Sequence, residues 1–158
     1  MTTLRTMTRI SLRPATRGDY DFLWWLHRVT MRPYVEATWG WDEAWQSHYF
    51  QQHFDPASRD IIEADGVTVG CISAERHEER IFLAVIEIAP DYQNRGIATT
   101  LIRALLDEGD RTALPVELSV LKANPARRLY ERLGFSMVGE TGSHIVMRRT
   151  PHGRDRGV

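Results

Sequence analysis

The sequence predicts a single α/β domain, of the α+β kind, with a mixed and mostly antiparallel sheet of about seven strands flanked by about four helices. Two observations predict this fold. The chain of 158 residues, 42% hydrophobic and 26% charged, has the size and composition of one globular domain with a packed core. Along the chain, the hydrophobic period changes between two residues, typical of strands, and 3.6 residues, typical of helices. We expect the domain to cover residues 1–150 and a flexible tail to cover residues 151–158.

The first third of the chain predicts one strand and two helices. Residues 9–13 alternate apolar and polar side chains, as a strand does. Thr16 and Asp19 have the spacing of a capping box, so a helix should begin there and end near Met31, because Pro33 follows. Its apolar face should bury Phe22, Leu23, Leu26 and Val29. An aromatic stretch predicts the second helix, with one face formed by Trp41, Trp45 and Tyr49.

The middle of the chain predicts three antiparallel strands, at residues 60–63, 67–74 and 80–88. Asp65-Gly66 is a favoured pair for the tight turn between the first two. The third strand is nearly all apolar, which is typical of a central strand covered on both faces, and Pro90 ends it.

The last third predicts two more helices and three more strands. A helical period runs from residue 95 or 96 to residue 108, with Gly109 as its expected end, and a buried strand follows at 116–121. Asn124 and Pro125 then predict the start of a fourth helix, because asparagine caps helices and proline suits their first turn. Gly134 should end that helix, and a hairpin should close the chain at 135–138 and 145–147.

The composition argues against several classes of function. The net charge is −1, from 20 basic and 21 acidic residues, so we expect no specific nucleic-acid partner; the basic ends fit solvated tails or an arm that touches phosphates. No apolar run approaches the ~18 residues of a membrane span, so we expect no membrane role. Cys71, the only cysteine, predicts a buried strand thiol and a reducing compartment, the cytoplasm. The six histidines show no ligand spacing, so we expect no metal.

The segment from Ile88 to Thr99 is a candidate anion site. A central strand ends at Ile88, a short loop follows, and a helix opens at Gly96. The first helical turn leaves backbone N–H groups without partners and carries the positive end of the helix dipole, so it favours a phosphate. Gly96 and Ala98 keep the approach free of bulk, and Arg95 adds a guanidinium.

Two other phosphate motifs do not fit this loop. No lysine and hydroxyl follow the glycine, as they would in a nucleotide P-loop, and the three-glycine dinucleotide fingerprint is missing. For this motif taken by itself, a helix that begins at a glycine for structural reasons alone is the alternative.

The loop at residues 93–99 is followed downstream by Asn124, Ala126, Leu129, Tyr130, Gly134 and Phe135. Together, these two segments resemble the GNAT superfamily, the Gcn5-related N-acetyltransferases, and the resemblance covers most of the chain. In that family, a loop reading Gln/Arg-x-x-Gly-x-Gly/Ala follows the fourth strand and holds the pyrophosphate of coenzyme A through backbone amides. The matching loop and the residue after it are Gln93, Asn94, Arg95, Gly96, Ile97, Ala98 and Thr99. The family pattern continues downstream as Asn124, Ala126, Leu129, Tyr130, Gly134 and Phe135. Ala98 replaces a commoner glycine, a substitution that the family accepts.

The resemblance implies acetyl-CoA as the cosubstrate and assigns roles to three residues. Asn124 would hydrogen-bond the pantetheine arm or the nearby backbone, and Tyr130 would lie beside the coenzyme sulfur. The backbone of Ile88 would pair with the pantetheine like an added strand. Relatives commonly pair through their late strands, so the resemblance also favours a homodimer.

The implied reaction is the direct attack of a primary amine on a thioester. An amine with a pKa of ~10 is mostly protonated at neutral pH, so a base must take its proton, and the departing thiolate benefits from a proton donor. We expect Glu87 to be the base, because burial in an apolar strand would raise its pKa; the alternative is a carboxylate that faces solvent or pairs with an arginine. We expect Tyr130 to be the donor; the alternative is a core tyrosine.

The two early helices and their loop should bind the amine acceptor, as in relatives. Aromatic rings attract a cation and carboxylates pair with it. We expect Glu36, Trp39 and Trp41 to bind the acceptor, and we expect Trp24, Trp25 and Trp45 to pack in the core. Weaker candidates for the acceptor pocket are His27, His48, Asp42 and Glu43.

Two other functions remain open at this point. An antibiotic-modifying acetyltransferase would need a more acidic acceptor cleft than this sequence clearly provides. A non-catalytic acyl-CoA-binding or interaction module on the same fold would keep the same loop, because it also needs the coenzyme.

Overall fold

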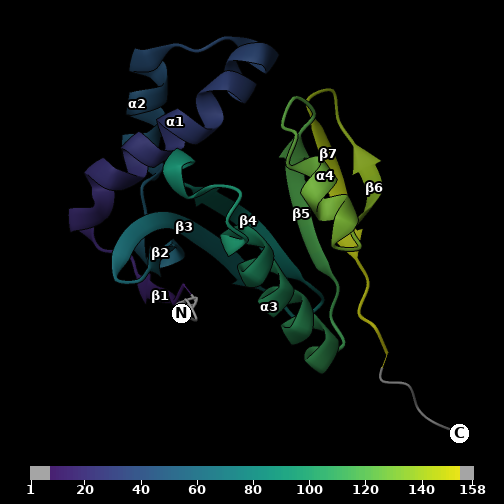
Figure 1. Cartoon of the computed structure of the whole chain (residues 1–158). Helices are drawn as coiled ribbons and strands as arrows, with labels where there is room; N and C mark the ends of the chain where they lie inside the picture. Colours follow the sequence, from purple (N-terminus) through teal and green to yellow (C-terminus); the bar gives the residue numbers. More distant parts are fainter. Residues whose placement is uncertain (1–7, 154–158) are drawn as a thin grey trace, which may run out of the picture.

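The computed structural model describes residues 8–153, and these form a seven-stranded sheet with the order β1-β2-β3-β4-β5-β7-β6 (Figure 1). The pairing of β4 with β5 is parallel and the others are antiparallel, so the predicted fold class is confirmed. The strands are β1 (Ile10–Pro14), β2 (Asp60–Ala64), β3 (Val67–Arg76), β4 (Ile81–Ile88), β5 (Val116–Leu121), β6 (Ser136–Glu140) and β7 (His144–Arg149). Most of the predicted tail, residues 154–158, lies outside the described residues.

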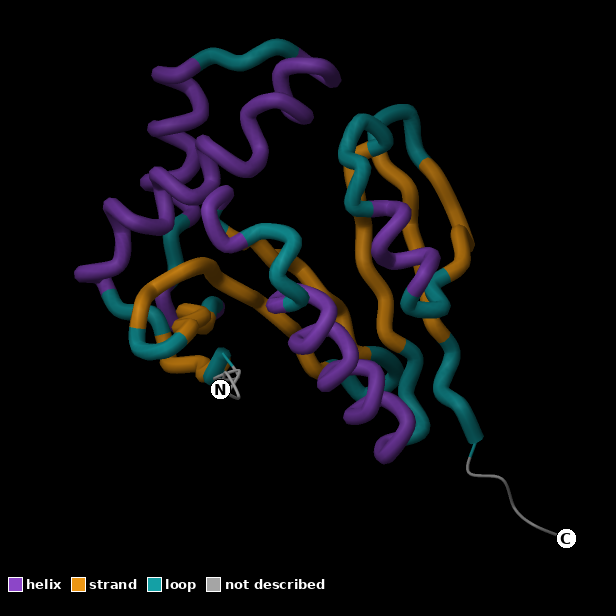
Figure 2. Tube along the Cα trace, in the orientation of Figure 1, coloured by secondary structure: helices purple, strands orange, loops and turns teal. Residues whose placement is uncertain are grey.

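Four α-helices cover the two faces of this sheet: α1 (Tyr20–Trp39), α2 (Glu43–His53), α3 (Ile97–Thr112) and α4 (Arg127–Arg132). Successive strand residues point to opposite faces, so Ile61 packs with α1 and α2 while Ile62 packs with α3. The first core also contains Leu23, Leu26 and Phe50. The second core is larger and contains the apolar stripe of α3 together with Tyr130 of α4. Figure 2 shows these helices on either side of the strands.

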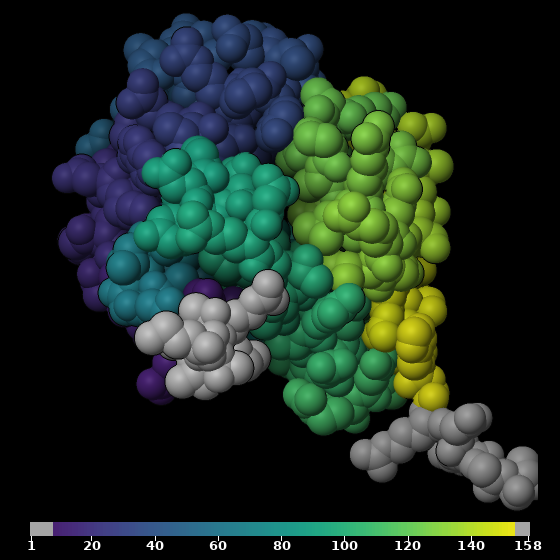
Figure 3. Space-filling model, in the orientation of Figure 1, coloured from purple at the N-terminus to yellow at the C-terminus, as the bar shows by residue number. Residues whose placement is uncertain are grey.

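β4 and β5 diverge after a short parallel ladder. The pairing with β5 stops at Leu83, after three residue pairs, although β4 pairs with β3 as far as Ile88. Ser73 lies opposite Val85 but Ala74 lies opposite Leu83, so one extra residue, Ala84, forms a bulge in β4. A bulge increases the local twist of its strand, and this one sits where β4 leaves β5. The sheet therefore opens between these strands, and Figure 3 shows the surface hollowed between teal and light-green residues.

Helix α1 is longer than predicted. It does not end near Met31 but continues through Pro33 to Trp39, and Gly40 ends it with a φ of +80°. Proline removes one intrahelical hydrogen bond, which costs stability in a helix interior. Val35, which follows the proline, is buried, and this burial stabilises the continued helix and offsets part of that cost. The predicted burial was right for Leu23 and Leu26 and wrong for Val29, which is 38% exposed.

Gly109 has a different role from the predicted helix end. Helix α3 runs past it to Thr112, and Ala113 follows with a φ of +58°. A Cβ atom at Gly109 would lie 2.7 Å from the carbonyl oxygen of Leu114, so the glycine allows the chain after the helix to approach closely. Gly109 therefore marks a close packing contact and not the end of the helix.

Several local predictions are confirmed. Thr16 and Asp19 form the capping box, Cys71 is fully buried in β3, and Asp65 and Gly66 form the tight turn with φ values of +51° and +81°. The prediction for α2 was wrong in part. Trp41 precedes the helix, and the stacked pair Trp45 and Tyr49 faces solvent while Phe50 is buried. The prediction that Trp25 and Trp45 pack in the core was also wrong, because they are 44% and 57% exposed.

Candidate active site

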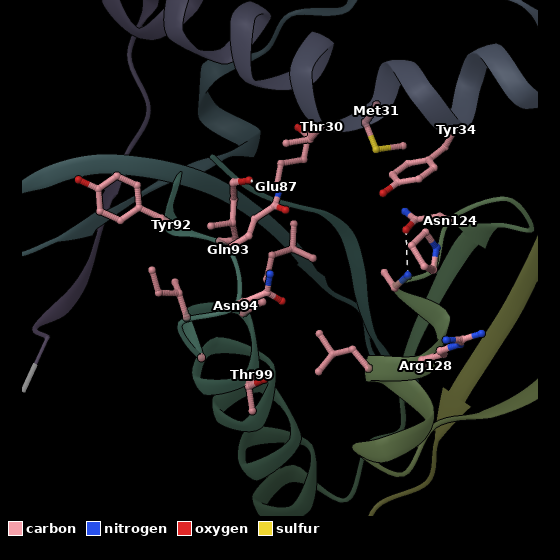
Figure 4. Close-up of a pocket in the computed structure, with 18 of the residues that line it drawn as sticks. Thr30, Met31, Tyr34, Glu87, Tyr92, Gln93, Asn94, Thr99, Asn124 and Arg128 are labelled. Carbon is pink, nitrogen blue, oxygen red and sulfur yellow. Dashed lines mark hydrogen bonds between the residues drawn. The ribbon is translucent and has the colours of Figure 1, made fainter. Parts of the chain in front are cut away.

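A cavity of about 610 Å³ lies where β4 and β5 separate (Figure 4). One wall is the end of β4 with the loop and first turn of α3, and the opposite wall is the segment from Asn124 to Arg132. The second half of α1 forms a third wall of the cavity. Two elements distant in sequence thus face each other across one cavity, at the segments that carry the two motifs.

The predicted pyrophosphate loop lines this cavity with six of its seven residues, Gln93, Asn94, Gly96, Ile97, Ala98 and Thr99. Thr100 donates the first intrahelical hydrogen bond of α3, to the carbonyl oxygen of Gly96, so the helix does not use the N–H groups that precede it. Gly96 has a φ of +81°, which glycine adopts without strain, and no atom beyond its two chain neighbours lies within 4 Å of where its Cβ would be. The exception is Arg95, whose guanidinium lies over the ring of Tyr92 at 5.0 Å.

The end of β4 also fits an extended ligand. Beyond Leu83, the edge of β4 that faces β5 has no ladder partner among the described strands. Such an edge presents backbone N–H and C=O groups to a ligand that can pair like a strand. Gln93 occupies part of it already, because its Nε2 donates to the carbonyl oxygen of Ile88 at 2.9 Å. Together with the first turn of α3, this edge suits a pyrophosphate that carries an amide-containing arm.

The second motif is divided between the cavity and the core. Asn124 lines the cavity, and its Oδ1 accepts a hydrogen bond of 2.9 Å from the N–H of Ala126, so it caps the start of the segment that leads into α4. Tyr130 is not among the lining residues; it is 8% exposed, with its ring edge-on to Phe135 at 5.9 Å. Burial raises the pKa of Tyr130 to about 12, so this phenol keeps its proton at neutral pH.

Glu87 lines the cavity and is 5% exposed, with its carboxylate turned toward α1. Its Oε2 accepts a hydrogen bond of 3.0 Å from Thr30 Oγ1 and lies 3.3 Å from His27 Nδ1. Its Oε1 lies 3.8 Å from Arg59 Nη1. The prediction that burial would raise the pKa of Glu87 was wrong. Burial does favour the neutral acid, but the hydrogen bonds and charges of these partners outweigh it and hold the pKa below its ordinary value.

None of the three predicted acceptor residues lines the cavity. Glu36 is exposed beside Arg32, with 4.0 Å between Oε2 and Nε. Trp39 is 63% exposed, with its ring 5.9 Å from that of His144. Trp41 stacks on Trp24 at 6.5 Å and donates its Nε1 hydrogen bond to Glu43. Their role in acceptor binding stays a prediction.

The cavity wall on the α1 side consists instead of Thr30, Met31 and Tyr34, which lie in or beside the region expected to bind the acceptor but were not predicted individually. Tyr34 faces Asn124 across the cavity in Figure 4. Tyr34 lies four residues after Thr30 and three after Met31, which are the spacings of neighbours on one helix face. The signal was present in the sequence, but the prediction that the helix ends near Met31 separated Tyr34 from the other two residues.

The described part of the chain contains no group of three or more His, Cys, Asp or Glu side chains placed to hold a metal ion. Among residues 8–153, no helix combines the length and apolar character needed to cross a membrane.

Comparison with known proteins agrees with this geometry. The model of the Acetyltransferase (GNAT) family matches residues 20–135, which contain both motifs. The spermidine N(1)-acetyltransferase of Escherichia coli strain K12 is 29% identical over 143 residues, and the match covers 83% of this chain and 75% of the relative.

Solved structures share the fold at lower identity. The PaiA N-acetyltransferase of Thermoplasma acidophilum, solved in complex with coenzyme A, has a TM-score of 0.72 at 17% identity, over 90% of this chain and 99% of that one. The ribosomal-protein-S18-alanine N-acetyltransferase of Escherichia coli has a TM-score of 0.63 at 17% identity, over 95% and 99% of the two chains. Both motifs contribute residues to one cavity, and the family model matches most of the chain, so the chain belongs to the acetyltransferase (GNAT) family and is an acetyl-CoA-dependent acyltransferase.

Proposed function

We propose that this protein is an N-acetyltransferase that acetylates a primary amine. The observation that carries the proposal is the cavity between β4 and β5, which meets the α3 anion site at one end and the buried carboxylate of Glu87 at the other. The first end suits a phosphate, and the second end suits the proton of an ammonium group. The relative with spermidine N(1)-acetyltransferase activity, and the solved N-acetyltransferases, support an amine as the acceptor.

The residues of the α3 wall and of β4 would hold the cosubstrate. When bound, acetyl-CoA supplies an acetyl group activated as a thioester. The N–H groups of the first turn of α3, with Gly96 at its start, would bind the pyrophosphate. The open edge of β4 near Ile88 would pair with the pantetheine arm, and Asn124 would hold that arm from the opposite wall.

Two side chains would move protons. Glu87 would take a proton from the ammonium group of the acceptor, because it is the one carboxylate among the described lining residues. Its lowered pKa keeps it ionised, and thus able to accept a proton, at neutral pH. Tyr130 would donate to the departing thiolate, since burial keeps its phenol protonated; this role requires its hydroxyl to reach the cavity from the core.

The charge of the cavity favours an acceptor with one ammonium group. The wall of α1 presents Thr30, Met31 and Tyr34, all uncharged, and Glu87 already has a cationic neighbour in Arg59. An extended polycation would need a carboxylate for each further ammonium group. Moving an unpaired charge from water into the protein interior costs roughly several kcal/mol. The likeness to a spermidine acetyltransferase favours the second candidate, a polyamine acceptor.

Thermal unfolding with acetyl-CoA, free CoA, NADH and ATP, followed by turnover of an amine panel, tests this function. CoA compounds alone should stabilise the folded chain, by about 2.7 kcal/mol at a hundredfold excess over the dissociation constant. Thiol release should then occur with phenethylamine at a higher kcat/KM than with spermidine. No stabilisation of folded protein by millimolar acetyl-CoA would refute the coenzyme site. Thiol release with alcohols but not with amines would refute N-acetylation, and a preference for spermidine would refute the single-charge acceptor.

A location in the cytoplasm and a homodimer remain predictions. Size-exclusion chromatography with light scattering measures the second directly, and a monomer at micromolar concentration would refute it.

A further inference from the structure

The carboxylate of Glu87 is closed off from water on the side away from the cavity. It is 5% exposed, and it lies against α1 through Thr30 and His27, against the loop before β2 through Arg59, and against β3 through Cys71. Bound substrates would fill the cavity in front of it. A proton that Glu87 takes from an acceptor therefore needs another way out before the next turnover.

His27 connects this carboxylate to the surface. Its Nδ1 lies 3.3 Å from Glu87 Oε2, and its side chain is 26% exposed. Imidazole carries its second nitrogen, Nε2, on the other side of the ring, and it can accept a proton at one nitrogen while it releases a proton from the other. Of the other groups that contact Glu87, the guanidinium of Arg59 has no atom that accepts a proton, the hydroxyl of Thr30 does not titrate in water, and burial raises the pKa of the Cys71 thiol to about 12.

Aromatic rings hold the imidazole in place. The ring of His27 packs against Phe50 at 5.6 Å and against Trp24 and Trp41, each at 6.3 Å. Trp24 and Phe50 belong to the core between α1, α2 and the sheet. This packing fixes the side of the imidazole that faces Glu87, and it explains why Trp41, a predicted acceptor residue, lies outside the cavity.

We infer that His27 is the residue that carries the acceptor's proton from Glu87 to water. The N–H bond of the ammonium group breaks, and its proton binds the carboxylate of Glu87. That proton then moves from Oε2 to Nδ1 of a His27 whose hydrogen is on Nε2, and the imidazolium releases the Nε2 proton to water. Exchange of the neutral imidazole between its two tautomers restores the start, with no net change in charge. His27 is a positioning and relay residue, and this role rests on the proposed acetylation of amines.

His27→Asn is the variant that separates a relay from a structural role. The asparagine amide can replace Nδ1 as a hydrogen-bond partner of Glu87, but it cannot carry a proton. At low buffer concentration, kcat should fall by at least about tenfold while the KM for acetyl-CoA changes by less than about twofold. Added imidazole at tens of millimolar should restore kcat several-fold in the variant and leave the wild type unchanged. His53→Asn, at an exposed histidine that ends α2, is the matched control and should behave as the wild type.

A second readout needs no turnover. In protein with isotope-labelled glutamate and no substrate, the pKa of the Glu87 carboxyl, measured by NMR, should rise in His27→Gln, because the amide can keep the hydrogen bond but loses the charge interaction of His27 that lowers this pKa. An unchanged titration would refute the link between the two residues. A folded His27→Asn with full kcat, or with a low kcat that imidazole does not restore, would refute the relay even if amine acetylation is confirmed. His27→Gln serves the kinetic comparison equally if His27→Asn does not fold.

Discussion

The side-chain amide of Gln93 donates a hydrogen bond of 2.9 Å to the carbonyl oxygen of Ile88, five residues earlier in the chain. This bond ties the loop before α3 to the last residue of β4. It holds the candidate pyrophosphate site and the open strand edge in a fixed relation, so one contact orders both ends of the proposed coenzyme site.

Replacing this amide should weaken coenzyme binding. Gln93→Ala loses the bond, and we expect about 1 kcal/mol less stability and a several-fold higher KM for acetyl-CoA. Gln93→Glu should be worse, because a carboxylate cannot donate and would face the carbonyl oxygen. Steady-state kinetics and the thermal shift with CoA measure both effects. Equal KM values in the wild type and Gln93→Glu would contradict this role.

Removing the charge of Glu87 should stop the chemistry while coenzyme binding continues. In Glu87→Gln we expect kcat to fall by about 10²–10⁴, because the amide cannot take the acceptor's proton. The thermal shift with CoA should persist, since Glu87 faces α1 and not the α3 loop. Glu75→Gln, at an exposed carboxylate of β3, is the control. A Glu87→Gln variant that retains kcat would show that another group takes the proton.

The phenol of Tyr130 should matter for rate and not for binding. With a pKa of about 12, it stays protonated up to at least about pH 10, so it can donate across the whole accessible range. Tyr130→Phe should lower kcat by about tenfold to a hundredfold and leave the KM for acetyl-CoA nearly unchanged. Tyr49→Phe, at an exposed tyrosine of α2, is the matched control. Full activity of Tyr130→Phe would identify Tyr130 as a core residue only.

Gly109 should resist substitution although it lies inside a helix. Alanine is the better helix former, by about 1 kcal/mol, but its Cβ would lie 2.7 Å from the backbone carbonyl oxygen of Leu114. We therefore expect Gly109→Ala to lower the free energy of unfolding by about 1–3 kcal/mol in urea titrations. Gly18→Ala, where the nearest atom is 3.5 Å away, should change it much less. A gain in stability at position 109 would mean that the chain after α3 relaxes without cost.

Asp19 should contribute stability that is lost in acid. The hydrogen bond from Arg13 lowers its pKa from the ordinary 3.8 to about 2, with a backbone hydrogen bond at Thr16 as a further cause. A lowered folded-state pKa stabilises the folded chain above the unfolded-state pKa, and this contribution disappears as pH falls through the folded-state value. Asp19→Asn should therefore be less stable by about 1 kcal/mol at pH ~6, and the difference should vanish between about pH 4 and pH 2. A difference that persists at pH ~2 would place its origin in packing.

The order of the elements was predictable because each one carries a local signal. The apolar run of β4 and the period of α3 need no knowledge of distant residues. The split between β4 and β5 was not predictable, because the bulge at Ala84 depends on how β4 pairs with β3. The α1 wall was missed since Pro33 is a strong local signal for a helix end, and burial of Val35 acts against that signal only in the folded chain.

The predictions for the site divide in the same way, between features set by local sequence and features set by distant residues. The helix start at Gly96 could be predicted because it depends on local conformation, and its role as an anion site stays a prediction. The basicity of Glu87 was predicted in the wrong direction, because its sequence neighbours are apolar while its spatial neighbours are His27 and Arg59. Pairing of this kind joins residues about 30 and 60 positions apart, which a single sequence does not reveal.

The short ladder between β4 and β5 divides the sheet into two halves that are joined by few hydrogen bonds. One half is β1-β2-β3-β4 and the other is β5-β7-β6, with three residue pairs between them, while α3 packs on both. A ligand arm that pairs with the free edge of β4 would take the place that β5 leaves open beyond Leu83. Cosubstrate binding would then add to the chain's own tertiary contacts, because the bound arm would join the two halves of the sheet beyond Leu83.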